Sequence, residues 1–319
     1  MNSVLVDMNN LMVSKLYSKN VMDKNGYNVE NINYDIWKFS VFESVYWYGI
    51  KFNADEIVLA VDYPVSWRKL YFPRYKEHRQ KTKDKFNVDW KEFNTICKEF
   101  LSELKQHFPF KIIQKKYAEG DDVIASIVLN FKNNKYTIVS SDKDYLQLCR
   151  KNLKIFSLMK QQFIDHPNPE MFLQESSLVG QQKDNIFNIM TPLDYPSELR
   201  KPPFGQKKAE KFFIIGLDSA LNQNVEYKRK YIDSAGVSRY YKANINLKER
   251  YDFNRNLMDF TKIPESVQKV VVGCYKSYKY PHPKEIYNFF TKYKWPTMLD
   301  NFTNIENKLL TLYKSECIM

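Results

Sequence analysis

Short runs of apolar residues, spaced through the first half of the chain, most constrain how this protein can fold. They cover residues 4–6, 57–61, 111–113 and 136–139. The runs are continuous and do not alternate with polar residues, which is typical of strands buried on both faces. Between them, residues 37–48, 90–108 and 123–131 carry apolar side chains at helical spacing. This alternation predicts an α/β fold with a central, mostly parallel sheet between helices.

The strand pattern fades after about Asp184. Helical spacing then returns over residues 207–215, 247–260, 264–274 and 282–293. We therefore expect an α/β core over residues 1–185 and a mainly helical region over residues 186–319. Residues 66–91 break the pattern of the core, because this stretch between a strand and a helix is basic and interleaved with aromatic residues. It reads as an insertion that leaves the globule.

The net charge of the 319 residues is +12, from 49 basic and 37 acidic side chains. Such an excess suits an anionic partner, most often nucleic acid, but an AT-rich genome would also enrich lysine. No stretch approaches 18 apolar residues, so we expect no membrane span. The chain begins with a strand-like run and its four cysteines lack metal-ligand spacing, which favours a leaderless cytoplasmic protein with free thiols.

Carboxylates follow three of the predicted strands. Asp7, Asp62 and Asp142 come directly after such runs, and Asp144 lies two residues further on. The carboxyl ends of parallel strands meet at one edge of a sheet, where ligands bind, so these side chains should converge. Taken singly, an aspartate after a strand is more often a helix cap or a turn residue.

More acidic residues join this set. Glu119, Asp121 and Asp122 precede the helix that starts near residue 123, and Asp184 follows the sheet region. So many carboxylates at one edge would repel one another unless cations neutralise them. A ligand set made only of oxygen suits Mg²⁺ or Mn²⁺, and two such ions close together are a common device for hydrolysing phosphodiesters.

A different chemistry for Asp7 is covalent phosphoryl transfer, with Asp7 as the acceptor. A site of the haloacid-dehalogenase type would need a second aspartate two positions later. That position holds Asn9, which disfavours this interpretation.

The sequence resembles the 5′-nuclease (flap endonuclease) family in six blocks that occur in order and cover essentially the whole chain. The blocks are Asp7, 61–62, 67–79, 118–125, 140–144 and 180–186. Residues 275–279 and 281–290 also resemble a bacteriophage branch of the family. The resemblance implies a PIN/5′-nuclease-like fold, with a helical arch at about residues 66–91 and a duplex-binding region at 186–319.

The resemblance also implies the reaction. It is a divalent-metal-dependent 5′→3′ exonuclease and flap endonuclease activity, including ribonuclease H activity, on RNA/DNA and DNA/DNA duplexes. The implied role is removal of RNA primers during lagging-strand replication. Similar phage nucleases work with a single-stranded DNA-binding protein and a sliding clamp, and we expect a monomer.

Residue roles follow from the same resemblance. Two Mg²⁺ ions, for which Mn²⁺ may substitute, would be held by Asp7, Asp62, Glu119, Asp121, Asp122, Asp142, Asp144 and Asp184. Lys76 and Arg79 would stand at the base of the arch against the scissile phosphate, and with Asp62 and Asp142 they form the expected catalytic set. Tyr75 would stack on a terminal base.

Further contacts to nucleic acid are expected from Arg68, Arg74, Lys81 and Lys83, and from Gly205, Lys207 and Lys208. The last three would hold duplex phosphates at a helix start, with a monovalent cation, and Arg200 and Lys201 could add charge. The alternative for Lys76 and Arg79 is a solvated basic helix, and the alternative for the element at Gly205 is an ordinary surface helix that starts at glycine. We expect residues 80–85 of the arch to be mobile, because few apolar side chains pin them.

One position departs from the family pattern. The pattern after the sheet reads Gly-Asp-x-x-Asp-Asn, and Gln181 replaces its first aspartate, while Asp184 remains. A neutral amide binds Mg²⁺ more weakly than a carboxylate, so the second metal should bind less tightly. Gln181 also leaves open a structure-specific DNA-binding protein with weakened catalysis. A PIN-type ribonuclease is a third option, but it would lack the arch and the helical region.

Overall fold

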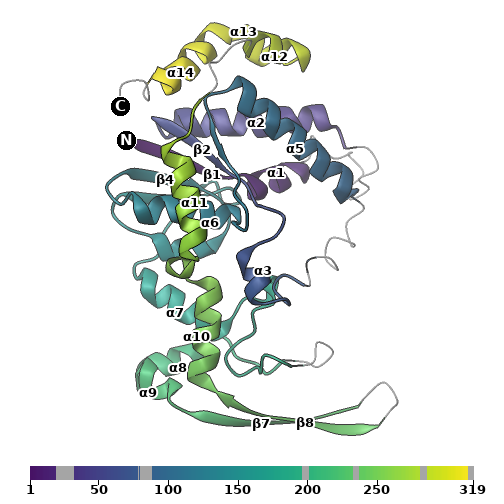
Figure 1. Cartoon of the computed structure of the whole chain (residues 1–319), viewed down its shortest axis with the longest axis vertical. Coiled ribbons are helices and arrows are strands. Elements are labelled where there is room, and N and C mark those ends of the chain that lie inside the picture. The colour runs from purple at the N-terminus through teal and green to yellow at the C-terminus, as the bar shows by residue number, and fades with distance from the viewer. Residues whose placement is uncertain are drawn as a thin grey trace. The chain divides into compact units, whose positions relative to one another are not determined.

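The computed structural model describes residues 1–18, 32–77, 79, 88–195, 201–232, 237–280 and 286–314. Within it the chain forms two compact units (Figure 1). Unit 1 comprises residues 1–67, 81–165 and 263–319, and unit 2 comprises residues 68–80 and 166–262. The expected mobile stretch 80–85, with Lys81 and Lys83, lies outside the described residues. The expected functional division at residue 185 stays a prediction.

Unit 1 is built on a six-stranded sheet in the order β3-β2-β1-β4-β5-β6. Its strands are β1 (Asn2–Asp7), β2 (Glu56–Ala60), β3 (Lys111–Ile113), β4 (Lys135–Val139), β5 (Leu153–Ser157) and β6 (Gln162–Ile164). All pairs are parallel except β5 with β6. The four predicted runs are β1 to β4, so the mostly parallel α/β sheet is confirmed. The strands β5 and β6, at one end of the sheet, were not predicted.

Helices cover both faces of this sheet. On one face, α1 (Met8–Leu16), α2 (Tyr34–Lys51) and α5 (Trp90–His107) share a core with α12 (Ile286–Lys292), α13 (Pro296–Asp300) and α14 (Phe302–Lys314). Val4 and Val6 of β1 enter that core, whereas Leu5 between them points to the opposite face. There α6 (Gly120–Asn130) packs on β1 and β2, and α11 (Glu265–Lys276) packs on α6 (Figure 1).

A buried polar cluster around Glu56 links α11 to the sheet. Glu56, at the start of β2, is 1% exposed, and its Oε2 lies 2.9 Å from Nζ of Lys111 on β3. The hydroxyls of Ser3 and Tyr275 donate to Oε1 of the same carboxylate. The residues near the C-terminus therefore complete the α/β unit of the N-terminal half.

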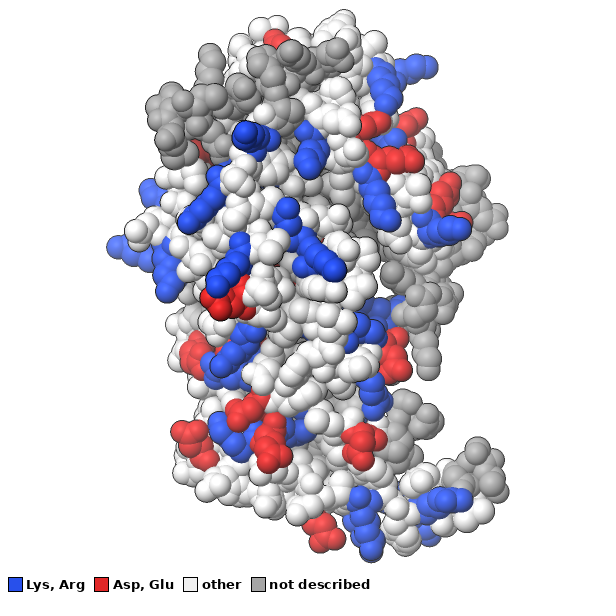
Figure 2. Space-filling view, viewed as in Figure 1, with Lys and Arg blue, Asp and Glu red and all other residues white. Residues whose placement is uncertain are grey.

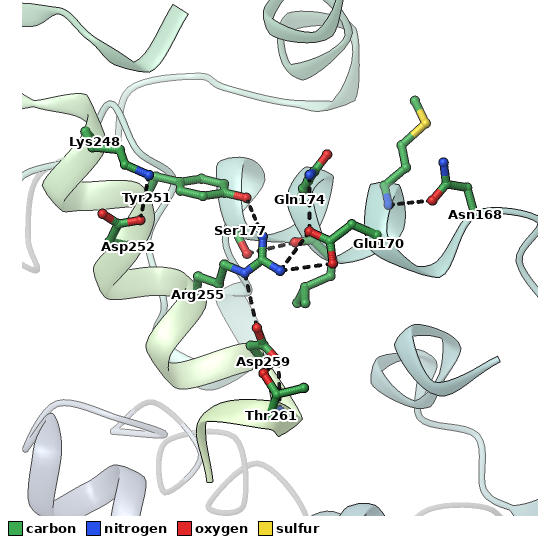
Figure 3. Close-up of polar contacts among 12 residues, drawn as sticks. Asn168, Glu170, Gln174, Ser177, Lys248, Tyr251, Asp252, Arg255, Asp259 and Thr261 are labelled. Carbon is green, nitrogen blue, oxygen red and sulfur yellow. Dashed lines mark hydrogen bonds and ion pairs between the residues drawn. The ribbon is translucent and has the colours of Figure 1, made fainter. Parts of the chain in front are cut away.

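Unit 2 is mainly helical. It contains α7 (Pro169–Val179), α8 (Gln206–Ile215), α9 (Leu217–Leu221) and α10 (Leu247–Met258), and it takes in residues 68–71 of α3 (Trp67–Tyr71). Arg255 of α10 binds Glu170 of α7 and Asp259 beyond its own helix (Figure 3). Unit 2 also carries an antiparallel ribbon of β7 (Asn224–Ile232) and β8 (Ser238–Asn246), where no strand was expected.

Candidate metal centre and nucleic-acid interface

Parallel register brings three acidic residues to one edge of the sheet in unit 1. Asp7 ends β1 and pairs with Ala60, two residues before Asp62, while the neighbouring strand β4 ends three residues before Asp142. Asp7 also caps α1, because its Oδ1 accepts a hydrogen bond of 3.1 Å from the amide of Asn10. Asp7 therefore caps a helix, which is the usual role of an aspartate that follows a strand. It also lies at the edge of the sheet where the three acids meet.

The environment of Asp7 shows how close these charges are. Burial, followed by the nearby charge of Asp62, raises the pKa of Asp7 to about 7, with a smaller contribution from Asp142. Hydrogen bonds from the amide of Asn10 and from Ser140 Oγ, at 2.9 Å, oppose this rise. Asp7 thus carries its charge with difficulty when no cation is near.

The environment of buried Tyr145 also shows that several acidic residues lie near one another. It lies on the 3₁₀ helix η2 (Lys143–Leu148), and its hydroxyl is 3.4 Å from Oδ2 of Asp7. Burial raises its pKa well above the ordinary value, and the charges of Asp7, Asp121, Asp142 and Asp62 raise it further. Four of the predicted ligands therefore lie near enough to this hydroxyl to disfavour its ionisation.

The start of α6 holds a second acidic group. Glu119, Asp121 and Asp122 each offer a carboxylate oxygen within 4.8 Å of the others, the single group of this kind found among the described residues. Glu119 accepts a hydrogen bond of 3.1 Å from Ser66 Oγ. Asp122 accepts one of 3.1 Å from Trp67 Nε1 and one of 2.9 Å from the amide of Glu119, which forms a capping box.

Gly120 ties this group to Asp62. Its amide donates to Oδ1 of Asp62 at 2.7 Å. A Cβ at this position would lie 3.2 Å from that oxygen and 3.3 Å from the carbonyl oxygen of Ala60. The close approach therefore favours glycine, and it places the end of β2 beside the start of α6.

Several positioning residues were missed from the sequence. Asn9 Oδ1 accepts a hydrogen bond of 2.9 Å from the amide of Asp62, and Asn10 Oδ1 accepts one of 3.0 Å from the amide of Ser141. Ser140 Oγ accepts from the amide of Asp142 at 3.1 Å. The neighbouring asparagine side chains of Asn9 and Asn10 were the signal in the sequence, since asparagine at a strand end often forms hydrogen bonds to nearby backbone. Asp142 in turn positions Asp144, because its Oδ1 accepts a hydrogen bond from the amide of Asp144.

In unit 2, Asp184 is held by the residues expected at the base of the arch. It is 4% exposed, and Nη2 of Arg79 lies 2.8 Å from its Oδ1. The amide of Lys76 donates to its carbonyl oxygen at 2.9 Å, with Lys76 in the left-handed region at φ 57°. Asn185, also left-handed, donates from Nδ2 to the carbonyl oxygen of Arg74. These contacts hold Lys76, Arg79 and Asp184 together. The role of Asp184 as a metal ligand stays a prediction.

Two residues expected to touch nucleic acid lie in the interior of unit 2. Arg68 is 2% exposed, and its Nε donates to the carbonyl oxygen of Leu257 at 2.7 Å. Tyr75 is 4% exposed and packs in an apolar cluster with Phe72 and Leu173. In this structure both side chains support the packing of their own unit, and their expected contacts with nucleic acid stay predictions.

The remaining expected contacts are more accessible. Arg74 is half-buried, and its Nη1 donates to the carbonyl oxygen of Tyr195 at 3.1 Å. Gly205 caps α8, and it is exposed together with Lys207 and Lys208 in the first turn of that helix. Gly216, at φ 95°, connects α8 to α9. The exposed first turn of α8, with Lys207 and Lys208, suits phosphate, because a helix start and lysines both attract anions.

Known proteins resemble this chain along most of its length. A family model described as "5'-3' exonuclease, N-terminal resolvase-like domain" matches residues 2–176, and one described as "T4 RNase H, C terminal" matches residues 168–305. The chain is 27% identical over 278 residues to ribonuclease H of Enterobacteria phage T4, which covers 82% of this chain and 84% of that protein. It is 38% identical over 93 residues to the exodeoxyribonuclease of Enterobacteria phage T3, 28% of each chain.

Solved structures show the same fold. The T5 D15 protein co-crystallised with metal ions superposes with a TM-score of 0.60 at 17% identity, covering 86% of this chain and 97% of that one. A complex of the T5 D15 flap endonuclease with DNA and metal ions gives a TM-score of 0.59 at 15% identity, over 86% and 97% of the two chains. Within the described residues, every helix is too short or too polar to span a bilayer.

Proposed function

Because the chain belongs to the 5′-3′ exonuclease family and is a hydrolase of the 5′-nuclease type, we propose that it cuts phosphodiesters at the 5′ ends or flaps of RNA/DNA and DNA/DNA duplexes. The observation that carries this proposal is the meeting of acids at one edge of the sheet, where Asp7 ends β1 beside the end of β2 and Gly120 joins Asp62 to the acidic group at the start of α6. A cluster of this kind has little use in a protein that only packs or only binds an anion.

The donor set fits hard divalent cations, since every candidate ligand is a carboxylate oxygen. We infer two Mg²⁺ ions, replaceable by Mn²⁺, held among Asp7, Asp62, Glu119, Asp121, Asp122, Asp142, Asp144 and Asp184. Such ions supply electrophilic polarisation of a phosphate. The raised pKa of Asp7 supports the inference, because a nearby cation would favour the carboxylate that burial disfavours.

The protein's own residues would position the substrate. Lys76 and Arg79 supply the cations that balance charge on the scissile phosphate, and Arg79 is already oriented by Asp184. Asn9 and Ser140 fix the backbone of the acidic loops, so the carboxylates are presented in one arrangement. The start of α8, with Lys207 and Lys208, would hold duplex phosphates, with a monovalent cation at the same element.

Removal of RNA primers during lagging-strand replication is the biological role that we propose. It would take place in the cytoplasm of an infected cell, with the protein acting as a monomer. A single-stranded DNA-binding protein and a sliding clamp are the proposed partners. The similarity to a phage ribonuclease H supports this context.

A second candidate is a structure-specific DNA-binding protein with weakened catalysis, and Gln181 in place of the family's aspartate favours it. The retained acids at the ends of β1, β2 and β4 and at the start of α6 favour the enzyme. A duplex-binding protein without catalysis would gain affinity by losing these negative charges.

A labelled 5′-flap substrate and a nicked duplex with an RNA 5′ end, each incubated with and without Mg²⁺, test the proposal. We expect short 5′ products only when the metal is present. Tight binding without cleavage in either Mg²⁺ or Mn²⁺ would support the second candidate and contradict the first.

A further inference from the structure

The β7–β8 ribbon of unit 2 has two chemically different faces. Residues directly opposite each other on the two strands share a face, and successive residues along a strand alternate between faces. On the inner face, Val225 pairs with Ile245 and Arg229 pairs with Tyr241, and these side chains are buried or half-buried. On the outer face, every described side chain is exposed.

The inner face is used to fold unit 2. The hydroxyls of Tyr227 and Tyr195 are 3.1 Å apart, and Nη1 of Arg229 donates to Tyr195 at 3.4 Å. Tyr241 donates to Asp194 Oδ1 at 2.7 Å. These contacts hold the ribbon against the loop at residues 191–195 and leave its outer face without a folding role.

The outer face concentrates positive charge. Lys228 lies directly opposite Lys242, and Lys230 lies opposite Tyr240. Like charges in directly opposed positions destabilise a β-ribbon. None of the three lysines forms an ion pair within the described part of the chain, and Nζ of Lys228 lies 4.9 Å from the centre of the Tyr240 ring. The sole acidic side chain among the described residues of this face is Glu226, opposite Asn244.

We propose that this outer face, formed by Lys228, Lys230, Tyr240 and Lys242, binds the phosphate backbone of double-stranded nucleic acid. The inference rests on the proposed function, since it gives a 5′ nuclease a second hold on the duplex. The nine paired residues of the ribbon extend for about 30 Å, and a duplex carries one negative charge about every 1.7 Å of its axis. Basic side chains along the ribbon are visible at the bottom of Figure 2.

The shape of the element favours a duplex over a single strand. A two-stranded ribbon fits the major groove or lies along its phosphates, and its flat, paired backbone cannot wrap a flexible strand. Single strands are usually held by several aromatic platforms, whereas this face offers Tyr240 alone among its described residues. The contact would be made to phosphates and would not read sequence.

Lysines on edge strands can also prevent two ribbons from pairing edge to edge. Both strands of this ribbon are edges, so this role competes with the proposal. It does not require two lysines to face each other across the ribbon. The two roles differ in what is lost when the charges are removed.

The test compares Lys228→Gln/Lys242→Gln with the matched control Lys98→Gln/Lys105→Gln on exposed positions of α5. Binding to a labelled blunt duplex is measured in EDTA by fluorescence anisotropy over a series of KCl concentrations. We expect the ribbon variant to raise Kd about tenfold at moderate salt and to make the plot of log K against log salt less steep by about two. Lys230→Gln should reduce the slope by about one. The control should match wild type.

Folding is checked by the thermal midpoint, which should stay the same or rise because a repulsive pair is removed. Unchanged Kd and slope in both ribbon variants would overturn the proposal. Self-association of the ribbon variant in size-exclusion chromatography, without loss of duplex affinity, would also overturn it and assign the lysines to edge protection. Flap cleavage in Mg²⁺ is measured separately on wild type. A wild type that binds through the ribbon but never cleaves would contradict the proposed nuclease and leave the ribbon inference standing.

Discussion

At the scale of single residues, a substitution of Asp142 should affect cleavage and duplex binding differently. Its amide is fixed by Ser140, and its own Oδ1 fixes the amide of Asp144, so its side chain is positioned by the loop. We expect Asp142→Asn to abolish cleavage, by a factor of about 10³ or more, because a neutral amide is a poor ligand for Mg²⁺. Duplex binding should stay equal or tighten, since a repulsive charge is removed. Full activity in this variant would contradict the assignment of the site.

The raised pKa of Asp7 predicts an unusual pH dependence in the metal-free protein. An acid whose pKa is about 7 in the folded state and near 4 in the unfolded state binds more protons when folded. Stability in EDTA should therefore fall as the pH rises from about 4 to 7, by about 2–4 kcal/mol. Urea unfolding at several pH values measures this. Asp7→Asn should flatten the dependence, and a wild type equally stable at pH 5 and pH 7.5 would refute it.

Gln181 predicts a weakened metal position. The residue is the N-cap of the 3₁₀ helix η3 (Gln182–Asp184), its amide donates to the carbonyl oxygen of Ile186, and its side chain makes no capping bond. Aspartate is favourable at such a position, so Gln181→Asp should preserve the fold. We expect this variant to reach half-maximal cleavage at a lower Mg²⁺ concentration, because it adds a carboxylate ligand. Identical half-saturation in a Mg²⁺ titration would exclude the effect.

At the scale of the element, the packing of α7 on α10 depends on Arg255 (Figure 3). Its guanidinium lies 2.7 Å from Glu170 and 3.1 Å from Asp259, which is 3% exposed. Arg255→Ala would leave Asp259 with less compensation and should destabilise unit 2 by about 2 kcal/mol. Lys269→Ala is the matched control, because its pair with Glu265 is exposed and should contribute less than about 0.5 kcal/mol. Equal urea midpoints for the two variants would contradict this role.

The elements also show why part of the fold could be predicted. Buried strands such as β1 and β2 are continuous apolar runs, and α5 and α10 have clear helical spacing, so burial leaves a pattern in the sequence. The β7 strand reads Asn-Val-Glu-Tyr-Lys-Arg-Lys-Tyr-Ile, and most of its side chains face solvent. Charged side chains fill the exposed positions and reach the half-buried face at Arg229, so the alternation that signals a strand is weak in the sequence, although the partner β8 is the next element along the chain.

The site could be predicted to a similar extent. The acids that follow strands were found because a parallel sheet sends them all to one edge. The interior positions of Arg68 and Tyr75 could not be foreseen, since motif position says nothing about exposure. Asn9 and Ser140 were missed for a related reason, because their role is to bond to backbone amides that tertiary packing brings near.

At the scale of the whole molecule, the net charge of +12 combines two opposed sets of groups. Lysines lie on the β7–β8 ribbon and at the start of α8, whereas carboxylates gather at the sheet edge of unit 1. On the face that Figure 2 displays, basic and acidic side chains are interspersed, so the sum alone locates no binding surface. Phosphate should be attracted by the first set and repelled by the second.

This opposition predicts how divalent cations affect substrate binding. Asp121→Asn, which should cleave slowly, permits binding to be measured in Mg²⁺ with little cleavage during the measurement. We expect EDTA to weaken its binding to a 5′-flap substrate at constant ionic strength, because uncompensated carboxylates then repel the scissile phosphate. Anisotropy titrations in EDTA and in Mg²⁺ measure the difference. A blunt duplex, which can bind through the basic elements alone, should lose less affinity. Equal losses for both substrates would show that the cation acts on the nucleic acid and not on the acidic cluster.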